Sequence, residues 1–239
     1  MPTPFDLSFA ILGFIAVTCG AAYFNRGFTR RMAEGDPDAR LNWYRGTMVG
    51  EWALAALAIA TWHAERRPWS ALGLVPPTDW RLYVGAGLAV VVAALLLRQT
   101  AKFRSLAPDR LERLVPKFAG VELVVPHSVR EYQWFMAVSW TAGVCEELLY
   151  RGFLTWVVAA YMGTAAALLI VSLAFGLGHA YQGRSGVVKT GVVGLLLGCI
   201  VLLSGWLIPA IIIHALIDLS SGVAGFIVLG EGNRRLVAE

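Results

Sequence analysis

The chain has 239 residues, of which 57% are hydrophobic and only 15% are charged. A soluble domain carries about 25% charged residues, so this composition excludes an ordinary soluble protein and predicts an all-α, polytopic bundle of transmembrane helices. The formal net charge of +4 is small. Because the basic residues fall mainly between apolar stretches, they indicate membrane topology and not nucleic-acid binding.

The first 130 residues are predicted to form an N-terminal transmembrane region with about three spans. We expect these spans at 7–24, 46–62 and 82–97, because roughly 20 helical residues cross the hydrocarbon core of a bilayer. The first stretch has neither a basic flank before it nor a clear cleavage site of small residues, so we expect it to remain as a span. Residues 110–118, in the connection after the third span, are expected to lie amphipathically on the membrane surface.

A second region, 131–229, is denser in apolar residues, and 230–239 form a short tail. Four further spans are predicted here, at about 132–161, 164–181, 190–204 and 206–219. The stretch 220–229 either extends the seventh span or forms a short eighth one, so the prediction is a bundle of seven to eight spans. Connections rich in Lys and Arg are predicted to face the cytosol, with the N-terminus outside: 25–45, 98–131, 182–189 and the tail with Arg234 and Arg235.

Three charged residues, Glu146, Glu147 and Arg151, lie in the middle of the fourth apolar stretch. Each charge at the centre of a span costs on the order of 2.5–3.5 kcal/mol, so intramembrane charges indicate function. Glu147 and Arg151 are four residues apart and share a helix face, whereas Glu146 points about 100° away from Glu147. We therefore expect one carboxylate to be paired with the arginine and the other to be left for chemistry, unless the triplet is a purely structural ion-pair cluster.

Two later stretches place imidazole groups at membrane depth. Phe175 and His179 are one turn apart on one segment, and His214 and Asp218 are one turn apart on another. Packed helices would bring these groups to one intramembrane polar cavity. Each pair also has a structural alternative, an interfacial histidine in the first case and a helix-stabilising pair in the second.

The three cysteines are odd in number and lie in apolar stretches without a CxxC spacing: Cys19, Cys145 and Cys199. This pattern argues against a disulfide framework and against a thiolate metal site. Cys145 adjoins Glu146, but a thiol in apolar surroundings is inert, so we expect it to be a packing residue.

The ordered set of motifs has a counterpart in a known family. On successive apolar segments the chain carries three motifs, Glu146-Glu147-x-x-x-Arg151, Phe175-x-x-x-His179 and His214-x-x-x-Asp218. Together they resemble the CAAX protease and bacteriocin-processing family, also called the type II CAAX prenyl endopeptidase or Abi family. The resemblance covers 131–229. The family pattern has Asn or Asp at the last position, most often Asn, so Asp218 is a tolerated departure.

The resemblance implies an intramembrane glutamate peptidase without a metal or other cofactor. Glu146 would be the general base that activates water, assisted by His179. His214 and Asp218 would polarise the scissile carbonyl group and stabilise the oxyanion, or an ionised Asp218 would instead orient His214. Glu147, Arg151 and Phe175 would support the site. The implied partners are membrane lipid and a peptide or membrane-protein substrate, with or without an attached lipid.

Two other functions stay open at this point. Glu146, His179 and His214 supply a His₂Glu set of the kind that catalytic zinc uses, although no HExxH motif is present. Buried Glu, His and Asp also line proton relays and transport pathways, and a bacteriocin-immunity protein or scaffold would bind a partner without cleaving it. The short loops and the lack of targeting signals point to a multi-pass protein of a bacterial inner membrane.

Overall fold

A computed structural model describes residues 1–230, apart from the side chains of 14, 16–22 and 108. The predicted tail after Gly230, with Arg234 and Arg235, and the side chain of Cys19 therefore lie outside the described residues. Within the described chain every regular element is a helix, which confirms the all-α prediction. The α-helices are α1 (Pro4–Ala33), α2 (Ala39–Ala64), α3 (Trp80–Arg104), α4 (Pro108–Glu112), α5 (Val129–Glu146), α6 (Thr155–Met162), α7 (Thr164–Gly178), α8 (Gly183–Ser204) and α9 (Ile208–Leu229).

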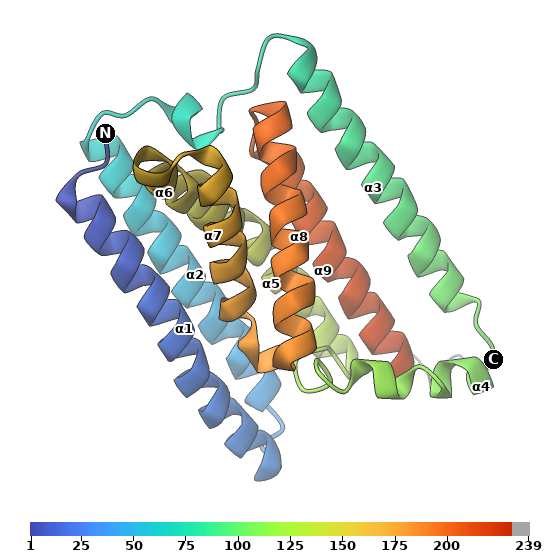
Figure 1. The fold of residues 1–239 in the computed structure, drawn as a ribbon. Coiled ribbons are helices and arrows are strands. Elements are labelled where there is room, and N and C mark those ends of the chain that lie inside the picture. Colours follow the sequence, from blue (N-terminus) through green and yellow to red (C-terminus); the bar gives the residue numbers. More distant parts are fainter. Residues whose placement is uncertain (231–239) are drawn as a thin grey trace.

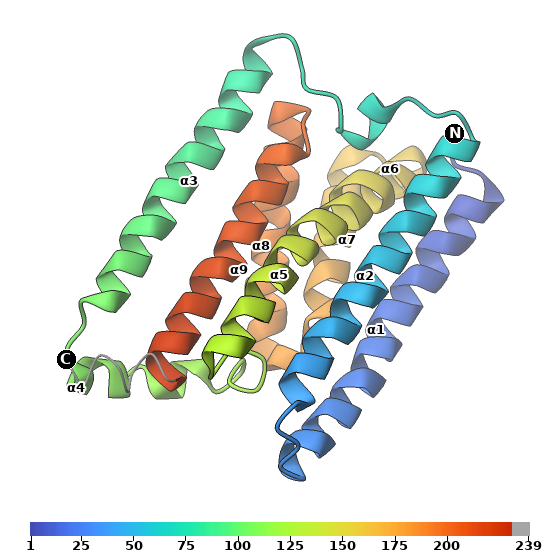
Figure 2. The ribbon, with the colours of Figure 1, turned by 180° about the vertical axis from the view of Figure 1, so that it is seen from behind.

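The long helices form one bundle in two layers. Figure 2 shows α3, α9, α5, α2 and α1 side by side, with α7 and α8 behind them. In Figure 1 the second layer is in front, and the short helix α4 lies across one end of the bundle with the 3₁₀ turn η2 (Val115–Phe118). Leu111 of α4 is buried against Ile227 and Val228 of α9. Helix α5, which ends at Glu146, packs against both α2 and α9 and lies between them.

Three helical segments of the described chain are long and apolar enough to cross a membrane: Trp80–Arg104, Ala180–Ser204 and Ile208–Leu229. Two shorter apolar segments, Pro4–Gly13 and Thr164–Gly178, accompany them. Large apolar side chains are exposed along α3, including Val90, Leu95 and Leu97, as expected for a surface that contacts lipid. The chain is thus an integral membrane protein. The stretch 220–229 is not a separate helix but the continuation of α9.

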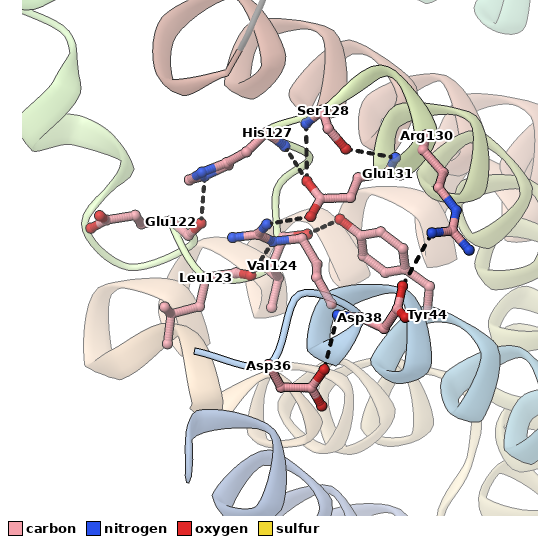
Figure 3. A network of polar contacts seen from close by, with 11 residues as sticks. Asp36, Asp38, Tyr44, Glu122, Leu123, Val124, His127, Ser128, Arg130 and Glu131 are labelled. Carbon is pink, nitrogen blue, oxygen red and sulfur yellow. Dashed lines mark hydrogen bonds and ion pairs between the residues drawn. The ribbon is translucent and has the colours of Figure 1, made fainter. Parts of the chain in front are cut away.

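A buried ion pair ties the beginning of α2 to the beginning of α5. Glu131 Oε1 accepts a hydrogen bond from Arg40 Nη1 at 2.7 Å. Its Oε2 accepts from the backbone N–H groups of His127 and Ser128, at 2.7 and 3.0 Å (Figure 3). The Ser128 hydroxyl accepts in turn from Glu131 N, which makes a capping box for α5. Because the arginine comes from a distant element, the sequence pattern alone did not reveal this pair.

The opposite end of the bundle is tied by a second buried pair. Both oxygens of Asp6 accept hydrogen bonds from the Arg67 guanidinium, at 2.8 and 2.6 Å. The Asp6 side chain is fully buried, and the guanidinium packs over the rings of Trp62 and Trp156 at 5.3 and 4.8 Å. This contact holds the start of α1 against the connection after α2.

Candidate active site

The acidic pair lies where the helix geometry changes. Helix α5 ends at Glu146, and the chain continues without a break as the π-helical segment η3 (Glu147–Leu154) before α6. The Thr155 hydroxyl donates to the Tyr150 carbonyl oxygen five residues earlier, at 2.8 Å. π-Helical segments such as η3 are rare and occur frequently at functional sites.

Close packing of α5 on α9 brings the acidic pair to His214. At Gly143 an added Cβ would lie 2.9 Å from Ala215 Cβ and 3.0 Å from the Ile211 carbonyl oxygen. Only a glycine therefore lets these two backbones approach so closely. One turn beyond this contact, η3 and the middle of α9 face each other.

Glu147 is held by two partners. Its Oε1 accepts a hydrogen bond from Arg151 Nη1 and another from His214 Nδ1, each at 2.8 Å. The side chains of Glu147 and Arg151 are 0% and 2% exposed. A carboxylate only accepts hydrogen bonds, so this contact places the hydrogen of a neutral His214 on Nδ1 and leaves Nε2 for other partners.

Glu146 is not bound to the arginine. Its Oε2 lies 3.7 Å from His214 Nε2, and the side chain is 17% exposed. The Oε2 atom itself is buried and has no hydrogen-bond partner within the described chain. The two neighbouring acids thus differ as their helical positions require, with one neutralised by Arg151 and the other unpaired next to an imidazole.

Asp218 faces the same imidazole nitrogen as Glu146. Its Oδ2 is 3.7 Å from His214 Nε2, which is longer than a hydrogen bond. The hydrogen bond that orients His214 therefore comes from Glu147 and not from Asp218. The Asp218 side chain is 35% exposed, compared with 17% for Glu146 and 6% for His214.

His179 reaches the site from the end of α7. Its Nδ1 donates to the Phe175 carbonyl oxygen at 2.9 Å, which leaves Nε2 free to accept. The Phe175 ring separates the two histidines, with its centroid 4.7 Å from the His179 ring and 5.7 Å from the His214 ring. The Arg151 guanidinium lies 4.0 Å from the centroid of the Phe175 ring.

Comparison with known families finds a match for part of the chain. The family model described as type II CAAX prenyl endopeptidase Rce1-like matches residues 129–220. This segment, called the Rce1-like domain, is similar to that family over less than half of the chain. No curated protein and no solved structure matches the chain significantly.

The family resemblance predicted from the three motifs is thus confirmed. The Rce1-like domain begins at the first residue of α5, ends within α9 and contains all seven predicted site residues. The family supports a protease, and hence a hydrolase, role for the protein.

The domain has one further neighbour that the motifs did not include. Glu51 of α2, a helix outside the Rce1-like domain, has a buried Oε2 atom without a hydrogen-bond partner in the described chain. An acid within an apolar stretch indicates a functional site, so the sequence did mark Glu51. Its position near the start of the predicted span, however, is also that of an interfacial residue.

Zinc was the alternative cofactor. Within the part of the chain that the structure describes, no group of three or more His, Cys, Asp and Glu side chains is arranged to hold a metal ion. The Nδ1 atoms of both histidines are engaged, by a carboxylate and by a backbone carbonyl group, an arrangement that metal-bound imidazoles also have. His214 lies between three acids, which suits an imidazole that exchanges protons.

Proposed function

We propose that the protein is an intramembrane endopeptidase in which Glu146 activates the water that hydrolyses a peptide bond. This proposal is supported by the different contacts that two adjacent acids make. Glu147 is neutralised by Arg151, whereas Glu146 keeps a buried, unpaired oxygen 3.7 Å from His214 Nε2. An unpaired carboxylate next to an imidazole can both remove and return a proton.

In this mechanism Glu146 takes a proton from water while the water oxygen attacks the scissile carbonyl carbon. The C–N bond then breaks, and Glu146 returns the proton to the amine nitrogen. The oxyanion that forms needs a hydrogen-bond donor. His214, which Glu147 holds through Nδ1, offers its Nε2–H when protonated, and we assign Asp218 and His179 to the same site.

The proposed architecture is a bundle of seven to eight spans around a polar cavity, with the Rce1-like domain as its core. We propose a peptide or membrane protein as substrate, with or without an attached lipid, and a bacterial inner membrane as the location. The zinc alternative predicts loss of activity with a chelator and recovery with added zinc.

The test compares the native protein with Glu146→Gln, which keeps the size of the side chain and removes its basicity. The matched control is Glu112→Gln on the exposed surface of α4. Membrane peptidomes of cells with each variant are compared by mass spectrometry. The purified proteins are then given an S-farnesylated peptide that ends in Cys-aliphatic-aliphatic-X.

We expect native protein and Glu112→Gln to cleave the peptide and Glu146→Gln to lose at least about 100-fold in kcat, the contribution of a general base. Glu146→Gln is also expected to lack specific cleavage products in its peptidome. Identical peptidomes, together with an uncleaved peptide, would refute the proposal. If cells with Glu146→Gln differ in phenotype from cells with the native protein, but the purified native protein does not cleave the peptide, a proton relay is favoured.

A further inference from the structure

Among the predicted site residues, His179 is the one that its own helix holds least. Helix α7 ends at Gly178, and the 3₁₀ turn η4 (Ala180–Gln182) begins one residue after His179. The chain then bends at Gly183, whose φ of +78° lies in the left-handed region. The imidazole is tied to α7 by the hydrogen bond from Nδ1 to the Phe175 carbonyl oxygen. Because a ring can tilt about a single hydrogen bond, neighbouring side chains must fix the direction of Nε2.

Two aromatic rings pack against this imidazole. The centroid of the Phe175 ring lies 4.7 Å from it with the planes at 55°, and that of the Tyr181 ring lies 5.8 Å from it with the planes at 34°. Both separations are within the range of about 4.5–7 Å at which aromatic rings attract each other. Phe175 is buried within α7, whereas Tyr181 is 37% exposed and belongs to the short turn η4. Tyr181 therefore needs a support from another element.

That support comes from α2, which lies outside the Rce1-like domain. The Trp43 ring packs edge-to-face on Tyr181, with the centroids 6.1 Å apart and the planes at 65°. Trp43 is 9% exposed, and its Nε1 donates a hydrogen bond to Asn25 Oδ1 of α1 at 2.9 Å. The Phe28 and Tyr44 rings lie 5.6 and 5.8 Å from it. The indole is thus fixed by the N-terminal helices before it meets Tyr181.

The ring of Tyr181, and not its hydroxyl group, makes these contacts. The hydroxyl accepts a hydrogen bond from Nε2 of the next residue, Gln182, at 3.2 Å. A bond between sequence neighbours ties Tyr181 to no other helix. A phenylalanine at this position would therefore keep the packing on both His179 and Trp43.

We propose that Trp43 and Tyr181 are positioning residues for the reaction. Trp43 holds the Tyr181 ring, and the Tyr181 ring holds the His179 imidazole so that Nε2 points toward the reacting water. This inference rests on the proposed function, in which His179 assists Glu146. Hydrogen bonds weaken steeply as their angle departs from linearity, so a small tilt of the imidazole slows the reaction. Helix α2 thereby takes part in catalysis without contacting the substrate.

The experiment uses the full-length protein with four changes, Trp43→Leu, Trp43→Phe, Tyr181→Leu and Tyr181→Phe. The matched control is Trp62→Leu, near the other end of the same helix. Trp62 is 0% exposed and packs edge-to-face on Trp156 at 4.8 Å. Its replacement therefore removes an equally buried indole from α2 without touching the contacts of His179.

Two readouts are compared. The first is kcat and KM on the S-farnesylated peptide, referred to the amount of folded protein. The second is the Cε1–H NMR signal of His179 in protein labelled with ¹³C-histidine, assigned with His179→Gln, which needs no substrate. Because neighbouring rings shift this signal, it reports the orientation of the imidazole. Trp43 reaches His179 through Tyr181, so a shift in Trp43→Leu reports an imidazole that has moved.

We expect Trp43→Leu and Tyr181→Leu each to lower kcat about threefold to tenfold, which is the effect of losing one aromatic pair. KM should change little in Trp43→Leu, because the indole is buried. The double variant should be no slower than Tyr181→Leu, since both changes act through one ring. Both phenylalanine variants should stay within about twofold of the native kcat, because a ring is kept. Trp62→Leu should keep the native kcat and the native His179 signal.

The outcomes separate the two proposals. If Trp43→Leu keeps the native kcat and His179 signal, or if Trp62→Leu alters both as much, the positioning role is wrong and the peptidase proposal stands. Should Trp43→Leu fail to fold, a native kcat in Tyr181→Leu, whose side chain is partly exposed, overturns the inference equally. If the native protein does not cleave the peptide, the peptidase proposal fails and the catalytic role falls with it. The His179 signal then still decides whether Trp43 orients the imidazole.

Discussion

Replacing Arg151 with methionine tests whether the buried ion pair holds the site together. Arg151 Nη1 donates to Glu147 Oε1 at 2.8 Å, with the two side chains 2% and 0% exposed. Methionine keeps most of the apolar contact with the Phe175 ring, which lies 4.0 Å below the guanidinium. The change therefore removes a charge and leaves the Glu147 carboxylate with His214 as its hydrogen-bond donor.

The expected cost follows from burial. Breaking a buried ion pair by removing one partner costs about 3–5 kcal/mol, because an uncompensated charge stays in the low-dielectric interior. The pair itself is imperfect, since Glu147 Oε2 and Arg151 Nη2 have no hydrogen-bond partners in the described chain. Removing both charges in Glu147→Gln/Arg151→Met is therefore expected to cost about 1–3 kcal/mol less than the sum of the single changes.

An exposed pair with the same spacing provides the control. Arg30 and Glu34 of α1 are also four residues apart and 2.8 Å from each other, but their side chains are 80% and 56% exposed. Arg30→Met is expected to cost about 0.5 kcal/mol or less. Stability is measured by reversible denaturation of the purified proteins in detergent micelles. If Arg151→Met is as mild as Arg30→Met, the argument from the buried pair is wrong.

Three further changes test the packing, the site and the pH response. An alanine Cβ at Gly176 would lie 2.6 Å from a backbone carbonyl oxygen of α8, so Gly176→Ala is expected to cost about 1–3 kcal/mol and to displace His179. Gly191→Ala, with its nearest contact at 3.5 Å, should be tolerated, and equal stability of the two variants would refute this. Asp218→Asn is expected to keep kcat on the farnesylated peptide within about threefold, because Glu147 orients His214 and an amide can donate to an oxyanion, whereas a loss of about tenfold or more would show that the carboxylate is needed. Burial, aided by Arg40, lowers the pKa of His127. As pH falls, the His127 imidazole of the unfolded chain therefore binds a proton before that of the folded chain does. The native protein should consequently lose more stability than His127→Gln as pH falls below about 6.5. Parallel plots of melting temperature against pH for the two proteins would contradict this.

Much of the protein could be predicted from local pattern. Long apolar stretches predicted the helices, and charges that interrupt them marked the candidate site. The four-residue spacing of Glu147 and Arg151 predicted their pairing, and the pair is present at 2.8 Å. The order of the three motifs predicted the family, which the match over residues 129–220 confirms. These features depend on helical periodicity and on hydrophobicity, and both are properties of neighbouring residues.

Contacts between distant helices were decided by the tertiary structure alone. Nothing near Glu131 in the sequence indicated that Arg40 would neutralise it, and nothing near His214 indicated that Glu147 would orient it. Likewise, α2 packs on α5 where Trp52 Nε1 donates to the Thr141 hydroxyl, and α9 packs on α5 where Gly143 lies against Ala215. Helical periodicity sets which face a side chain occupies. Which other face it meets depends on how the backbones pack, and that is a property of the whole bundle.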